Sequence, residues 1–87
     1  MPYIRKSERA LLDRALAPLL ADITLATTAG ELNYVFTTIL HKAFVPEVHG
    51  YARYNELMGA LECVKMELYR RRIALYENVK ISENGDV

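Results

Sequence analysis

The sequence predicts an all-α protein: an antiparallel helical hairpin preceded by a kinked or split N-terminal helix, three to four helices assembling as a homo-oligomeric helical bundle. No segment of the 87 residues alternates apolar and polar side chains for long, and no hairpin turn joins two such segments. Apolar residues recur instead at helical spacing along three segments. Hydrophobic residues make up 52% of the chain and the net charge is zero, a balance that favours self-association of a small domain.

The first helical segment follows Ser7, which is expected to cap it, with Glu8 in its first turn. Apolar residues at helical spacing run from Ala10 to Ile23. Pro18 interrupts the run, and proline inside a helix costs about 3 kcal/mol. The segment is therefore expected to be kinked or split near Ala17.

The second helix has the clearest start signal. Thr28 and Glu31 have the Thr-x-x-Glu spacing of a capping box. Apolar residues continue at helical spacing to Phe44, and Pro46 is expected to end the helix. The connection over residues 46–52 is short enough to return an antiparallel neighbour.

The third helix, over about residues 53–78, is expected to be the longest and to bury one narrow apolar stripe, formed by Leu57, Leu61, Val64, Leu68 and Leu75. Its C-terminal third extends beyond the reach of the shorter second helix and carries Ile73, Leu75 and Tyr76. We therefore expect this overhang to contact another copy of the chain. Residues 1–80 are expected to form a single domain, and residues 81–87, which include the turn signal Asn84-Gly85, an extended C-terminal arm.

Composition narrows the function. The chain has 11 basic and 11 acidic residues, without the basic excess of a general nucleic-acid binder. Its one cysteine, Cys63, allows neither an intramolecular disulfide nor a thiolate metal cluster and is expected to be a small packing residue. There is no apolar run of 18 residues and no signal peptide, so we expect no membrane contact and a cytoplasmic location, which is the host cytoplasm if a phage encodes the chain.

Polar residues accompany the apolar stripes of the second and third helices. On the second helix, Asn33, Thr37 and His41 follow one another at i, i+4 and i+8. In an antiparallel pair the two polar flanks face each other, which predicts a pocket of Asn33, Thr37, His41, Asn55, Glu62, Lys65 and Tyr69. The same residues also suit a buried polar network that fixes an oligomer interface, or a solvent-exposed surface.

The run Tyr69-Arg70-Arg71-Arg72 is the only dense basic cluster. Consecutive helix residues point in different directions, so at most two of these arginines act together on one group. Guanidinium groups beside tyrosine rings suit phosphate and base-stacking contacts, which favours a nucleotide-like ligand. The alternative for Arg70 is a solvated pair with Glu67 or Glu77, whereas Arg72 lies near the core edge, where an unpaired arginine is costly.

Signals for an enzyme are weak. A MazG-like nucleotide pyrophosphohydrolase needs carboxylates spaced by three or four helix residues to hold Mg²⁺, and the chain has no Glu-x-x-Glu pair. The pyrophosphohydrolase hypothesis therefore requires Glu31, Glu62 and Glu67 to meet across subunits. His41 and His49 have no third ligand at metal spacing. We therefore predict no catalytic residues, no metal site and no cofactor.

The segments GELNYV (30–35), YNELMGALECVKMELYRR (54–71) and ENGDV (83–87), with the opening MPYI, resemble a family of small all-α phage and bacterial proteins of unknown function. The resemblance implies a shared site without naming its ligand; the matching positions are Asn33, His41, Asn55, Gly59, Glu62, Lys65, Glu67, Tyr69 and Arg70. In size and helical class the chain is also similar to phage oligomers that sequester cyclic or ADP-ribose-like nucleotide signals of host defence, a fold-level analogy.

The leading hypothesis is a non-enzymatic homo-oligomer that binds a nucleotide immune signal in pockets at subunit interfaces. Phosphate contacts are expected from Arg72, Lys65 and Arg70, stacking from Tyr69 and Tyr54, and polar contacts from Asn33, Asn55 and His41. The alternatives are the MazG-like pyrophosphohydrolase and a structural or protein-binding adaptor that uses the overhanging third helix.

Overall fold

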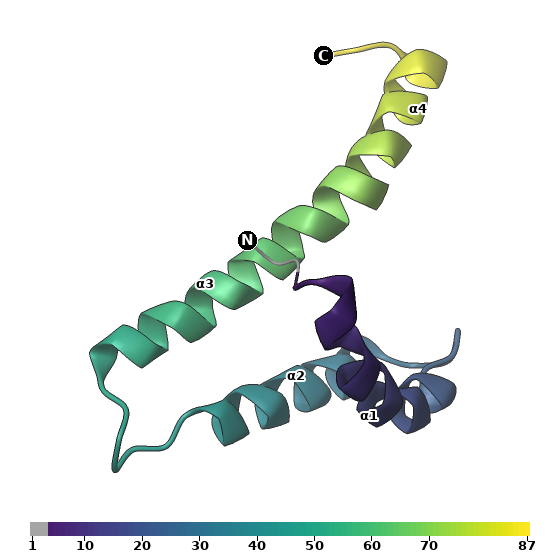
Figure 1. The fold of residues 1–87 in the computed structure, drawn as a ribbon. Coiled ribbons are helices and arrows are strands. Elements are labelled where there is room, and N and C mark those ends of the chain that lie inside the picture. Colours follow the sequence, from purple (N-terminus) through teal and green to yellow (C-terminus); the bar gives the residue numbers. More distant parts are fainter. Residues whose placement is uncertain (1–3) are drawn as a thin grey trace. The chain divides into compact units, whose positions relative to one another are not determined.

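The computed structural model describes residues 4–87, and every regular element in that range is helical, which confirms the all-α prediction. In chain order these are η1 (Lys6–Glu8), α1 (Arg9–Asp22), α2 (Ala29–Ala43), α3 (Tyr51–Leu68), η2 (Tyr69–Ile73) and α4 (Ala74–Asn84) (Figure 1). The last three form one uninterrupted helical run, called the long helix below. The chain divides into two compact units, residues 4–49 and residues 50–87, described in turn.

The first helix begins differently from the prediction. Ser7 does not cap it but lies inside the 3₁₀ turn η1, whose N-cap is Arg5. The Arg5 backbone N–H donates to the Glu8 carboxylate at 3.3 Å, and the Glu8 N–H donates to the Arg5 carbonyl at 2.9 Å. Helix α1 then runs through Pro18 as one helix, so the segment is not split near Ala17, while the kink stays a prediction. Proline removes one backbone hydrogen bond, and the rest of the 14-residue helix keeps its backbone conformation around that loss.

The capping box that starts α2 is confirmed. The Glu31 N–H donates to the Thr28 hydroxyl at 3.1 Å, and the Thr28 N–H donates to the Glu31 carboxylate at 2.8 Å. The hydrogen bond from the Thr28 backbone lowers the pKa of Glu31, and the Thr28 side chain lowers it further. Helix α2 ends at Ala43, with the extended Phe44 as its C-cap, just before Pro46 as predicted.

Replacing Thr28 with alanine is expected to lower the free energy of unfolding by about 1 kcal/mol, because the Glu31 N–H loses the hydroxyl oxygen that accepts its hydrogen bond. Serine keeps the hydroxyl, so Thr28→Ser is the control. Its free energy of unfolding should lie within about 0.3 kcal/mol of the wild-type value. Urea unfolding followed by circular dichroism measures both variants. Equal loss in the two would show that the threonine methyl group, not the cap, matters.

The same cap makes stability depend on pH. Because the folded-state pKa of Glu31 lies below its ordinary value of 4.5, the stabilisation is present above pH 4.5 and is lost as the pH falls through the folded-state pKa. Glu31→Gln removes this contribution, so the variant should lose less stability than the wild type on acidification below pH 4.5. Parallel acid slopes would contradict a role for the ionised carboxylate.

The connection after α2 is a compact turn. The Val45 carbonyl accepts from the N–H groups of Val48 and His49 at 3.0 and 2.8 Å, and the Val45 N–H donates to His49 Nδ1 at 2.8 Å. The imidazole also lies 5.8 Å from the Phe44 ring. These contacts order the short connection that the sequence predicts, while the antiparallel return of the chain stays a prediction.

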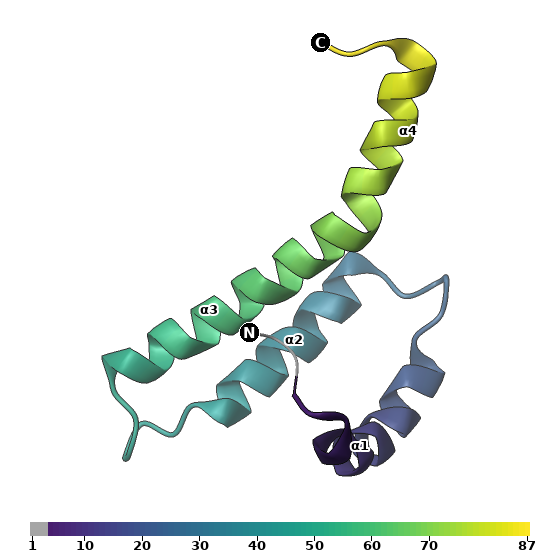
Figure 2. The same ribbon diagram turned by 45° about the horizontal axis from the view of Figure 1, so that its top comes forward.

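The long helix exceeds its predicted range at both ends. It starts at Tyr51, after the N-cap Gly50, and continues to Asn84. Residues 81–84, expected to be extended, are therefore helical, and only residues 85–87 follow the helix. Gly85 ends it with φ 88°, a backbone conformation that favours glycine. Figure 2 shows the ribbon changing direction between α3 and α4, where η2 lies.

None of the described residues is fully buried. Of the stripe predicted as core, Leu57 and Leu61 are half-buried, whereas Val64, Leu68 and Leu75 are 55%, 56% and 60% exposed. A single helix has no second surface to cover its apolar face, so the unit formed by residues 50–87 contains no core of its own. In residues 4–49 the half-buried apolar positions of α2 are Leu32, Val35, Leu40 and Ala43.

Candidate functional site

The long helix carries an open groove of about 480 Å³ beside the junction of α3 and η2. At about 100° per residue, Met66 in this groove lies roughly 180° around the helix from Leu57. The groove is therefore on the face opposite the apolar stripe. The residues that line it are Glu62, Cys63, Met66, Glu67, Tyr69, Arg70 and Ala74.

The segment η2 is a π-helical turn. The Ala74 N–H donates to the carbonyl of Tyr69, five residues earlier, instead of four as in an α-helix. The turn therefore holds one extra residue, and all that follows is shifted around the axis by about 100° relative to an unbroken α-helix. π turns are frequent at functional sites, which makes this one of interest.

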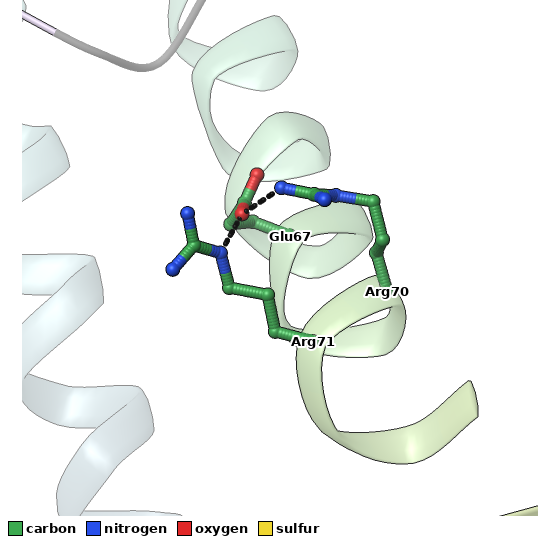
Figure 3. A network of polar contacts seen from close by, with 3 residues as sticks. All are labelled: Glu67, Arg70 and Arg71. Carbon is green, nitrogen blue, oxygen red and sulfur yellow. Dashed lines mark hydrogen bonds and ion pairs between the residues drawn. The ribbon is translucent and has the colours of Figure 1, made fainter. Parts of the chain in front are cut away.

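Two arginines of the π turn converge on one carboxylate (Figure 3). Arg70 Nη2 donates to Glu67 Oε1 at 2.7 Å, and Arg71 Nε forms an ion pair with the same oxygen. The predicted alternative that Arg70 pairs with Glu67 is confirmed. Glu67 is only 26% exposed at its side chain, while both guanidinium groups are largely exposed. The cluster shows that neighbouring arginines here reach a single anionic oxygen.

Two further predicted site residues have partners within the long helix. Lys65 Nζ lies 3.5 Å from Glu62 Oε1, an exposed pair of the kind that adds at most about 1 kcal/mol. The pKa of Tyr69 is raised, first by a hydrogen bond to the Glu77 carboxylate and then by its negative charge. Tyr69 therefore stays neutral and keeps its hydroxyl proton at neutral pH.

The other predicted residues lie elsewhere. On α2, the Thr37 hydroxyl donates to Asn33 Oδ1 at 3.0 Å, and His41 follows one turn later. Tyr54 and Asn55 lie in the first turns of α3, and Asn55 is roughly 21 Å along the axis from Tyr69. The structure therefore brings together Glu62 with Lys65 and Asn33 with Thr37. The predicted pocket between the polar flanks of the second and third helices stays a prediction.

Sequence reasoning missed the double pairing of Glu67. The spacing of Glu67 and Arg71 by four helix residues, acid before base, is favourable and could have indicated it. The π turn has no comparable signal in the sequence. It also changes the position of Arg72, whose side chain does not line the groove and makes no hydrogen bond or ion pair with residues 4–87.

The carboxylates of the alternative metal site have other partners: Glu31 caps α2, Glu62 pairs with Lys65 and Glu67 holds the arginines. Within the described part of the chain, no three His, Cys, Asp or Glu side chains are grouped to hold a metal ion. None of the helices over residues 4–87 is both long and apolar enough to cross a membrane.

Comparison with known proteins gives one match. A family model described as a domain of unknown function (DUF6899) matches residues 1–87. No curated protein and no solved structure matches the chain.

Proposed function

The chain belongs to the DUF6899 family over its whole length, and from that premise we propose that it is a non-enzymatic, homo-oligomeric helical protein that binds a phosphorylated, nucleotide-like small ligand. The proposal has two parts, assembly and ligand binding, which depend on different faces of the long helix.

The length of the long helix supports assembly. Its segments of 18, 5 and 11 residues give a rod of roughly 51 Å, whereas α1 and α2, with 14 and 15 residues, are roughly 21 and 22 Å long. Laid end to end, the two shorter helices do not span the rod. Exposed apolar side chains nevertheless continue along its stripe to Val79. Part of this face therefore needs a partner outside the chain, and a second copy supplies matching apolar surface.

The observation that carries ligand binding is the convergence of Arg70 and Arg71 on one oxygen of Glu67. A phosphate oxygen accepts the same charge-assisted hydrogen bonds, and arginine is suited to phosphate by its planar fork. Lys65, in the preceding turn, adds a third positive charge. Tyr69 lines the groove next to Arg70 and offers an aromatic face on which a base stacks.

These groups favour a ligand with both a phosphate and a planar base. We propose a cyclic or ADP-ribose-like nucleotide of host defence, which the protein sequesters in the cytoplasm without chemical change. The groove and the apolar stripe lie on opposite faces of the helix, so we place the ligand in the groove and the subunit contact on the stripe.

Native mass spectrometry of the full chain purified from cells tests both parts together. We expect an oligomer of defined mass that carries a nucleotide-sized adduct, released by denaturing extraction and identified by its own mass. A monomer would overturn the assembly part, and it would favour the protein-binding adaptor because an uncovered apolar rod needs another partner. An oligomer that stays free of adduct, and that ignores cyclic and ADP-ribose nucleotides when they are added, would overturn the ligand part. Mg²⁺-dependent release of pyrophosphate from a nucleoside triphosphate would favour the pyrophosphohydrolase instead.

A further inference from the structure

We propose that the C-terminal half of the long helix pairs antiparallel with the same segment of a second copy, and that Arg72 of each copy pairs there with Glu83 of the other. This inference rests on the assembly part of the proposed function and specifies its interface. It assigns Arg72 to assembly and not to the ligand.

The π turn decides which residues form this face. In an unbroken α-helix the stripe of Leu57, Leu61 and Leu68 continues through Leu75. Because the π turn adds one residue, the stripe continues instead one position later, through Tyr76. Arg72 continues the stripe within the π turn, and Tyr76, Val79 and Glu83 extend it beyond the turn; the four residues are spaced by four, three and four positions.

This spacing is the alternation by which two helices interdigitate along a narrow seam. The apolar centre of the seam is uncovered, with Tyr76 62% and Val79 54% exposed. In a parallel pair of helices each seam residue lies opposite its own copy, so like charges meet at both ends of the seam. Two apolar residues between them offer little contact to offset this repulsion. The sequence of the seam therefore distinguishes the two orientations.

In the antiparallel orientation the charges are complementary. When Tyr76 of one copy lies opposite Val79 of the other, Arg72 lies opposite Glu83, and the two-fold axis repeats both contacts. The Arg72 side chain has no ion-pair partner among residues 4–87 of its own chain. Among residues 4–87, the Glu83 carboxylate pairs with Lys80 at 3.3 Å; the Glu83 side chain is 56% exposed, and such a pair contributes little. Charge complementarity thus favours a second copy as the occupant of this face.

Charge reversal tests the pairing. In the full chain, Arg72→Glu and Glu83→Arg, each alone, place two like-charged contacts in the pair and should weaken association by roughly tenfold to hundredfold. The double variant Arg72→Glu with Glu83→Arg restores opposite charges and should return the association constant to within about threefold of the wild type. Sedimentation equilibrium measures association, and circular dichroism checks that each variant remains helical.

Arg71→Glu is the matched control, because it makes the same charge change one residue away on a side chain that pairs with Glu67 instead of lying on the seam. Weakening by Arg71→Glu equal to that by Arg72→Glu would overturn the inference, since it would reveal a general charge effect. Failure of the double variant to restore association would also overturn it. A wild-type protein that is monomeric would remove the assembly part of the proposed function itself, whereas an oligomer indifferent to Arg72 removes only this interface.

Discussion

Tyr76→Asp is expected to dissociate the oligomer, whereas Leu75→Asp should leave it intact. The two side chains are neighbours and almost equally exposed in the single chain, at 62% and 60%. An unbroken α-helix would place Leu75, not Tyr76, on the stripe that begins at Leu57. The π turn reverses this assignment, because it shifts the residues after Ile73 by one position.

The expected effect is large because a charge replaces an apolar contact twice in a symmetric pair. Burial of a large apolar side chain contributes about 1.5 to 3 kcal/mol, so two lost contacts weaken association at least about hundredfold. Leu75→Asp should change the association constant by less than about threefold. Size-exclusion chromatography with light scattering over a concentration series compares the variants. The opposite ranking would show that the stripe follows unbroken α-helical spacing in the assembled protein.

The second large effect concerns the ligand, and its two variants should act in opposite directions. Arg70→Ala with Lys65→Ala removes one positive charge that lines the groove and one from the preceding turn. Binding of a nucleotide should weaken at least about hundredfold, because a charged hydrogen bond contributes about 1.5 to 3 kcal/mol. Glu67→Gln leaves Arg70 and Arg71 in place but removes the negative charge with which both arginines pair. It should therefore strengthen binding.

Isothermal titration calorimetry with ADP-ribose and with a cyclic dinucleotide measures both variants, and light scattering confirms that the oligomer remains. If Glu67→Gln weakens binding as strongly as the double variant, the carboxylate orders the arginines and does not compete with a phosphate. If neither variant changes the binding of a nucleotide that the wild type binds, the groove is not the site.

Local signals account for what the sequence predicted well. The capping box of Thr28 and Glu31 and the stop before Pro46 depend on residues within a few positions of each other. The same holds for the pair of Arg70 with Glu67. The predicted cap at Ser7 and the split at Pro18 were wrong, because a 3₁₀ turn precedes α1 and the helix accommodates the loss of one hydrogen bond.

The candidate site was predictable only in part. Glu62 and Tyr69 were expected from the polar flank of the third helix and Arg70 from the basic run after it, and all three line the groove. Asn55 shares that flank, but Asn55 and Tyr54 lie about four α-helical turns from Tyr69 in the same helix. A helical wheel does not show this separation because it projects along the axis.

The sequence by itself determined that this protein is helical, that its helices are amphipathic and that the last is longer than its companions, since these properties arise from periodicity and local capping. The tertiary structure alone decided where the apolar stripe continues, because one extra residue in the π turn rotates everything after Ile73. It thereby moved Leu75 off the stripe and brought Tyr76 onto it, after Arg72 within the turn. It also left every apolar face of the described chain at least partly uncovered, because one rod and two short helices offer too little surface to bury them.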